Sequence, residues 1–134
     1  RDITNVTKLK TLFCSSLKVL GGVDTLAMEA LVMGADGWVA GLVCAYPRET
    51  VYLYQLILSG NLTEAVELYR WFIPLLELDL HPKLVQYIKL AETIEGIGSE
   101  YVRPPRLSLV GDERERILHL IQEANKLKPD LLQT

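Results

Sequence analysis

The fold can be inferred from Leu17 to Pro47, which reads LKVLGGVDTLAMEALVMGADGWVAGLVCAYP. It begins with a short apolar run, residues 17–20, that stops at the glycine pair Gly21-Gly22. Asp24 then opens a segment in which apolar residues recur at helical spacing. A second apolar run, residues 37–43, comes after that segment and a short break. The order strand, helix, strand predicts a βαβ unit.

The two apolar runs are nearly continuous, which is typical of strands in a parallel sheet that is covered on both faces. The helical segment is long enough to return the chain across a sheet, so we expect parallel strands joined by a right-handed crossover. Two strands alone would leave both edges of the sheet open. We therefore interpret the unit as the end of a larger barrel or sheet, of which this chain is the C-terminal piece.

The rest of the chain is expected to be helical apart from one extended connector, residues 101–110, which contains Pro104-Pro105 and has no helical period. Apolar spacing predicts a helix capped by Thr4 with a buried stripe of Val6, Leu9, Leu12 and Phe13, and further helices over Pro47 to Gly60, about Thr63 to Leu78, His81 to Gly96, and from Asp112 onward. Pro74 should kink or end its helix. Glu115 would complete a capping box with Asp112. Residues 1–60 are thus assigned to closing β/α units, and residues 61–134 to a helical extension of the same domain.

Composition excludes several classes of function. The 134 residues are 49% hydrophobic, enough for one domain with a sizeable core, and the net charge of −3 argues against a nucleic-acid partner. No stretch approaches the ~20 apolar residues of a membrane span. Cys14 and Cys44 have no metal-ligand or redox spacing, and we interpret them as buried free thiols of a protein in a reducing, cytoplasmic compartment. We expect no metal and no cofactor.

The ends of the two predicted strands are where a ligand would bind, because the active site of a parallel barrel lies at the C-terminal ends of its strands. Those ends are residues 21–25 and 40–44, on the same face. Glycines there would let a small acid approach the backbone. The alternative is that Gly21-Gly22 only turns the chain and that Asp24 only caps a helix.

The sequence contains no evident pairing of a nucleophile with a base. His81 is interpreted as an N-terminal cap before Pro82, and His119 as a residue on a helix face. Lys83 and Lys89 fall on a predicted helix outside the barrel, where we expect solvated charges. Trp38 and Trp71 are expected to be core or interface aromatics.

Taken in order, these residues resemble the dihydrodipicolinate synthase and N-acetylneuraminate lyase family. Its seventh and eighth β/α units are similar to Gly22-Val23-Asp24, Gly34-Ala35-Asp36-Gly37 and Pro47. Its tail helices and the extended segment between them are similar to His81 to Lys89 and to Val102-Arg103-Pro104-Pro105. The opening Arg1 to Asn5 resembles the segment directly after the lysine-bearing sixth strand. The resemblance covers nearly the whole chain, and the order and spacing are more specific than any single motif.

The resemblance implies the C-terminal part of a (β/α)8 TIM barrel and a class I aldolase or lyase, in which a barrel lysine forms a Schiff base with pyruvate or another 2-oxo acid. That lysine is expected upstream of Arg1, so no catalytic residue is expected in this chain. Gly22 would contact the substrate through its backbone, and Asp24 and Thr25 would reach its distal, hydroxylated part. Ala40 and Gly41 would line the imine pocket.

Three positions depart from the pattern of the synthases. Val23, Ala40 and Cys44 stand where synthases commonly carry an acidic residue, serine and asparagine, so a dehydratase, a deaminase or a sugar-acid aldolase of the family stays open. The resemblance also implies a homo-oligomer, a tetramer, because the tail helices of that family commonly help to assemble tetramers, and the apolar residues of the tail here fit this. The hypothesis from another class is a noncatalytic helical interaction domain.

Overall fold

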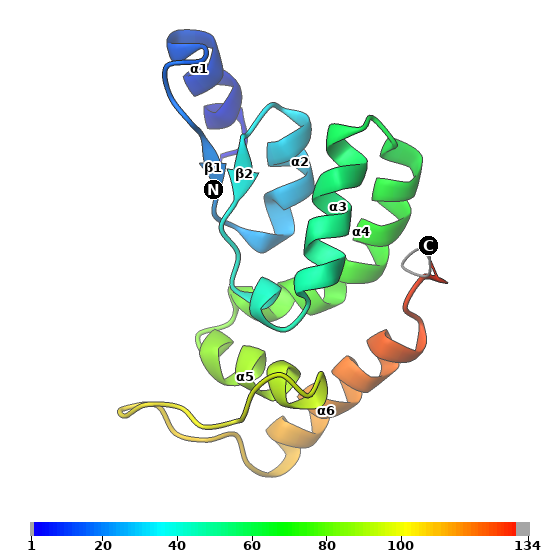
Figure 1. Ribbon diagram of the computed structural model, residues 1–134. Helices are drawn as coiled ribbons and strands as arrows, with labels where there is room; N and C mark the ends of the chain where they lie inside the picture. Colours follow the sequence, from blue (N-terminus) through cyan, green and yellow to red (C-terminus); the bar gives the residue numbers. More distant parts are fainter. Residues whose placement is uncertain (1, 131–134) are drawn as a thin grey trace.

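Two short parallel strands stand at the centre of the N-terminal half (Figure 1). β1 (Leu20–Gly21) pairs with β2 (Gly37–Trp38) in the register Leu20 to Gly37 and Gly21 to Trp38. A 3-10 helix, η1 (Asp24–Leu26), and helix α2 (Ala27–Val32) form the crossover between them. The computed structural model describes residues 2–130, and this pair is the one sheet within that range. The predicted parallel βαβ unit is confirmed.

Both strands are shorter than predicted. The first was expected over residues 17–20 and the second over 37–43, but each has two residues, and 3-10 helix η2 (Leu42–Cys44) replaces the end of the second. A strand continues only while its backbone groups find partners on a neighbouring strand. The amides of Gly41 and Leu42 are instead bound by the Asp24 side chain, so the chain turns away from the sheet.

The helices surround one apolar core. Helix α1 (Thr4–Phe13) precedes the sheet, and α3 (Pro47–Leu58), α4 (Leu62–Leu76), 3-10 helix η3 (Glu77–Leu80), α5 (Leu84–Ile94) and α6 (Gly111–Lys126) come after it. α3 packs on α4, and α4 packs on α6. Phe72 is fully buried at their centre, stacked on Trp71 with 5.3 Å between ring centroids and in edge contact with Tyr46. In residues 2–130 no helix is long and apolar enough to cross a membrane.

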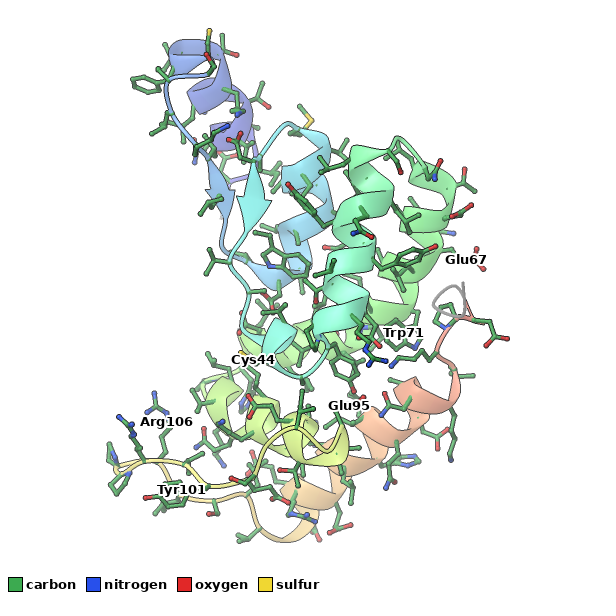
Figure 2. All side chains as sticks on the ribbon, in the orientation of Figure 1. Cys44, Glu67, Trp71, Glu95, Tyr101 and Arg106 are labelled. Atoms are coloured by element: carbon green, nitrogen blue, oxygen red, sulfur yellow. The ribbon has the colours of Figure 1, made fainter. Side chains whose placement is uncertain are left out.

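The connector is extended, as predicted. No helix or strand occurs over residues 101–110, which project as an arm beside α5 and α6 and carry Tyr101 and Arg106 (Figure 2). Val102 and Leu109, near its two ends, are buried, and residues 103–108 between them are exposed, with Leu107 82% exposed.

Of the two effects predicted for Pro74, a kink or an end, the end does not occur, because α4 runs on to Leu76. Pro74 and Arg70, whose carbonyl loses its partner, both lie on the exposed side. Two other details of the predicted helices are wrong. No capping box forms, because α6 begins at Gly111 with no side-chain cap. Thr4 is the first residue of α1 and does not cap it. The Asp2 side chain accepts hydrogen bonds from the Thr4 amide and from the Thr4 hydroxyl.

The expected burial of the N-terminal helix and of the cysteines is also wrong. Of the predicted stripe on α1 only Val6 is buried, and Leu12 is 74% exposed. Both cysteines are free, as expected, but both are exposed. Apolar spacing within a segment does not determine which of its residues other elements cover.

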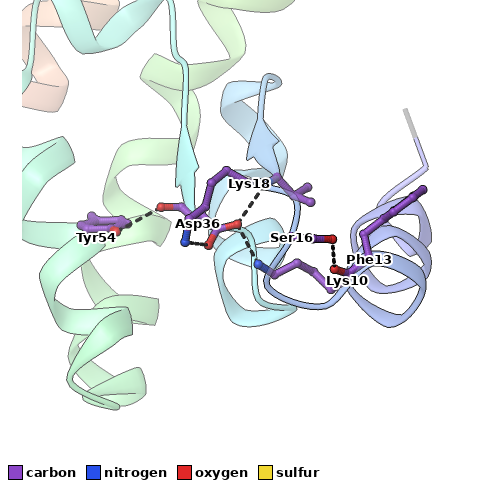
Figure 3. A network of polar contacts seen from close by, with 7 residues as sticks. Lys10, Phe13, Ser16, Lys18, Asp36 and Tyr54 are labelled. Carbon is purple, nitrogen blue, oxygen red and sulfur yellow. Dashed lines mark hydrogen bonds and ion pairs between the residues drawn. The ribbon is translucent and has the colours of Figure 1, made fainter.

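Asp36 ties α1 and the sheet together (Figure 3). Its carboxylate accepts hydrogen bonds from Lys10 Nζ at 2.7 Å, from Lys18 Nζ at 3.1 Å and from the Val19 amide at 2.8 Å. Its carbonyl accepts one from the Tyr54 hydroxyl on α3. The bond from Lys10, then those from Val19 and Lys18, hold the pKa of Asp36 below its ordinary value.

Replacing this carboxylate in Asp36→Asn should lower the melting temperature by several degrees, because the two lysines lose their counter-ion. The pKa of Asp36 is lower in the folded state than its ordinary 3.8, so its contribution is present above that value and is lost as the pH falls below it. The unfolding free energy of the parent should therefore fall more than that of the variant between about pH 7 and about pH 3.

Asp2→Asn is the matched control, since the pKa of Asp2 is also lowered but the partners of its carboxylate, Thr4 and Lys8, both lie on the adjoining helix α1. Equal changes in melting temperature for the two variants would contradict the role of Asp36 as a tie between elements.

Candidate functional site

The candidate site is the rim formed by the chain segments that leave β1 and β2, and the predicted residues differ in how they lie there. Gly22 is exposed, and Thr25, Ala40 and Gly41 are partly buried. Asp24 has no exposed surface at all. The structure brings Asp24 and Gly41 together, so the two segments meet at the same end of the sheet, as parallel strands require.

The Asp24 carboxylate binds the segment that leaves the other strand. Oδ2 accepts a hydrogen bond from the Leu42 amide at 2.9 Å, and Oδ1 accepts bonds from the Gly41 amide at 3.3 Å and from Trp38 Nε1 at 3.1 Å. Val23 occupies the cap position of η1, and no side chain caps that helix. The alternative that Asp24 only caps its own helix is therefore wrong.

Gly41 is confined from the opposite side by the helical tail. A Cβ atom added at this position would lie 2.1 Å from Asp79 Oδ1 on η3 and 3.1 Å from Ile88 Cδ1 on α5. A residue with a side chain would have to displace one of them. The close approach of these two side chains thus favours glycine at this position.

Tyr69 of α4 contacts the first loop of the rim. Its hydroxyl donates to the Asp24 carbonyl at 3.4 Å and lies 3.3 Å from Glu29 Oε2. Burial, and then the charge of Glu29, raises the pKa of Tyr69, so the phenol stays protonated and able to donate. Residues of the tail therefore touch both loops.

A mostly apolar cavity of about 200 Å³ lies beside Gly22. Its walls come from α1, including Val6 and Leu9, and from the chain around β1, Val19 to Val23. Thr25, Ala40 and Gly41 do not line it. The described residues thus bring the two loops together without enclosing all five predicted residues in one cavity.

His81 does not cap the helix as predicted, because α5 begins at Leu84 with Lys83 at its cap position and no side-chain cap. His81 Nδ1 accepts a hydrogen bond from the Lys83 amide at 3.1 Å, and its ring stacks on Tyr87. His119 is exposed on α6, with Nδ1 3.9 Å from Glu123. Across residues 2–130 no three acidic, cysteine or histidine side chains are grouped so as to hold a metal ion.

Every lysine of the chain is paired with a carboxylate. The pairs are Lys8 with Asp2, Lys10 and Lys18 with Asp36, Lys83 with Glu113, Lys89 with Glu92, Lys126 with Glu123, and Lys128 with Glu49. None of these lysines lines the cavity beside Gly22.

Several residues that shape the rim had no signal in the sequence. Trp38 was predicted to be a core or interface aromatic, and neither Asp79 nor Tyr69 was singled out. Tyr69 lies 45 positions from Asp24, and Asp79 lies 38 positions from Gly41. Local spacing carries no information on contacts of that kind.

Comparisons with known proteins agree on one family. A profile described as the dihydrodipicolinate synthetase family matches residues 1–124. The 4-hydroxy-tetrahydrodipicolinate synthase of Methanothrix thermoacetophila is 27% identical over 134 residues, covering 97% of this chain and 44% of that protein. The one of Thermomicrobium roseum is 32% identical over 103 residues, covering 75% of this chain and 33% of that protein. The chain therefore spans less than half the length of these relatives.

Solved structures give the same result. A putative dihydrodipicolinate synthetase from Pseudomonas aeruginosa matches with a TM-score of 0.81 at 30% identity, covering 92% of this chain and 42% of that one. A monomeric dihydrodipicolinate synthase variant matches with a TM-score of 0.80 at 21% identity, covering 94% and 43%. The second likeness, at that identity, concerns the fold alone.

Two glycines of the rim provide a matched pair of substitutions. Gly41→Ala should lower the free energy of unfolding by about 1–3 kcal/mol, because the new methyl group collides with Asp79. Gly22→Ala should change it by less than about 0.5 kcal/mol, because no described atom lies within 4 Å of its Cβ position. Urea titrations measure both values. Equal losses would show that the contact with Asp79 does not confine Gly41.

Proposed function

Because this chain belongs to the dihydrodipicolinate synthetase family, we propose that it is the C-terminal part of a lyase or aldolase that binds pyruvate or a related 2-oxo acid as a Schiff base. The observation that carries the proposal is the parallel pair β1 and β2, whose exit loops meet through Asp24 at one rim. Active sites of parallel barrels lie at that rim. In this proposal the last two β/α units of a TIM barrel supply the rim. The intact enzyme is proposed to be cytoplasmic.

The imine-forming lysine is proposed to lie in a segment that precedes residue 1. A lysine attacks a carbonyl as the neutral amine, so its environment must favour loss of the proton. The seven lysines of this chain all form ion pairs with carboxylates, and none of them lines the cavity beside Gly22. In the proposed reaction the amine adds to the 2-oxo carbonyl, water leaves, and the protonated imine accepts the electron pair of the bond that breaks.

The rim residues would shape the space around that imine. Gly22 is proposed to contact the substrate through its backbone, which its exposure and the open space above it support. Thr25 would face the distal part of the substrate. Ala40 and Gly41 would line the imine pocket, where their small size leaves room for a planar 2-oxo acid. Asp24 would affect the substrate indirectly, through the loop after β2 whose amides its carboxylate binds.

A dehydratase, a deaminase or a sugar-acid aldolase remains within this proposal, because Val23, Ala40 and Cys44 depart from the common pattern of the synthases. The other hypothesis, a noncatalytic helical interaction domain, is not favoured by a family match that covers residues 1–124, both strands included.

A homo-oligomer, a tetramer, is proposed for the intact protein. An apolar groove of about 560 Å³ runs between α4 and α6, lined by Trp71, Pro74, Leu120, Ala124 and Leu127. Arg70 of α4 and Glu123 of α6 lie on opposite sides of this groove. A second copy turned by a two-fold axis would place Arg70 against Glu123 of the other groove, because such interfaces are self-complementary.

Leu127→Asp should weaken this assembly, because Leu127 is 73% exposed in the groove and its change does not disturb the core. Leu107→Asp, at an exposed leucine of the arm, is the control and should leave the assembly unchanged. Sedimentation velocity on the intact protein measures both. A monomeric parent protein would contradict the proposal.

Reduction with borohydride in the presence of pyruvate tests the Schiff base. The intact protein should gain one covalent adduct, and peptide mass spectrometry should locate it on a lysine that precedes residue 1. The 134-residue chain alone should gain none, and so should the intact protein without pyruvate. An adduct on Lys83 or Lys89, or no adduct in the intact protein, would overturn the proposal.

A further inference from the structure

We propose that Asp24 is a positioning residue for the reaction: its buried carboxylate sets the place of the backbone from Trp38 to Leu42, and thereby of Ala40 in the wall of the imine pocket. This inference rests on the proposed function and deepens it. It assigns to Asp24 an action on the substrate through the second loop of the rim.

The geometry of the carboxylate is that of a clamp. All three of its donors belong to the other strand and its exit: the Trp38 indole at 3.1 Å, the Gly41 amide at 3.3 Å and the Leu42 amide at 2.9 Å. The side chain has no exposed surface, so these bonds are shielded from water. Both oxygen atoms are used within the protein.

The loop after β2 is also contacted by the helical tail. The tail carries Asp79 and Ile88 against Gly41, at 2.1 Å and 3.1 Å from the position of an added Cβ. The Tyr69 hydroxyl donates to the Asp24 carbonyl, so the clamping residue is itself bound to α4. Gly41 is therefore enclosed between the Asp24 carboxylate on one side and the tail on the other.

Ala40 is flanked by bound groups. The Trp38 indole, two residues before it, and the Gly41 amide, directly after it, both donate to Asp24. Its own side chain has no polar group, so its contribution to the pocket depends on where the backbone lies. Displacement of reacting groups by about 1 Å can cost about 10²-fold in rate, which is the effect that loss of the clamp should produce.

The test uses the intact protein with Asp24→Ala and Asp24→Asn. Asp24→Ala should lower kcat/KM by about 10²-fold, mainly through kcat, while the borohydride adduct with pyruvate still forms. Asp24→Asn keeps one acceptor oxygen and should lose about 10-fold or less. Rates are measured well below the melting temperature of each variant, so that loss of folded protein does not enter.

Asp36→Asn is the matched control, because Asp36 also accepts a backbone amide bond, from Val19 at 2.8 Å, but contacts neither loop of the rim. It should lower the melting temperature and leave kcat/KM within about twofold of the parent. If Asp24→Ala and Asp36→Asn both lower the melting temperature and both leave kcat/KM unchanged, Asp24 has a structural role only and the proposal is overturned.

A second readout monitors the clamp itself. In the parent protein the indole proton of Trp38 and the amide protons of Gly41 and Leu42 should exchange slowly with solvent, and in Asp24→Asn at least one of the three should exchange about 10-fold faster or more. Unchanged exchange at all three would contradict the clamp. If the parent forms no adduct with pyruvate, the proposed function fails, while the exchange measurement still decides whether the clamp exists.

Discussion

One buried carboxylate organises this structure. Asp24 comes after the first strand, and its two oxygens bind backbone amides 17 and 18 residues away, after the second strand. Buried amides need a partner, and here a side chain supplies the acceptor that a neighbouring strand otherwise would. The bonds end β2 after two residues, start η2, and place the exits of both strands at one rim. The location of the candidate site is a consequence of this arrangement.

The helical tail supports the same rim from outside. Tyr69 reaches the Asp24 carbonyl, and the Asp79 side chain lies so close to Gly41 that a residue with a side chain would have to displace it. Tyr69 and Asp79 of the helical tail are therefore part of the site's framework. On the other side of the sheet, Asp36 links Lys10 of α1 to the amide of Val19. The two aspartates together join the sheet to the elements on either side of it.

The apolar surface around the sheet agrees with membership of a barrel family. Leu20 and Val39, at the two strands, are 58% and 64% exposed, and Leu12 and Phe13 of α1 are also exposed. Strands in a parallel barrel have neighbours on both edges and helices outside. The chain spans less than half the length of its relatives, so neighbours of that kind would belong to the remainder of the barrel.

Local sequence was sufficient to predict the parallel βαβ unit, the helices from Pro47 onward, the extended connector and the family. The periodicity of apolar residues and the positions of glycine and proline indicate the first three, and the order of the motifs indicates the family. It identified Asp24 and Gly41 as residues of the rim but not how they act. The three-dimensional packing was needed to establish that the Asp24 carboxylate crosses to Gly41 and Leu42, that the strands stop early, and that α1 keeps an exposed apolar face. These outcomes depend on which buried donors and surfaces meet across distant parts of the chain, and periodicity within a segment does not encode its neighbours.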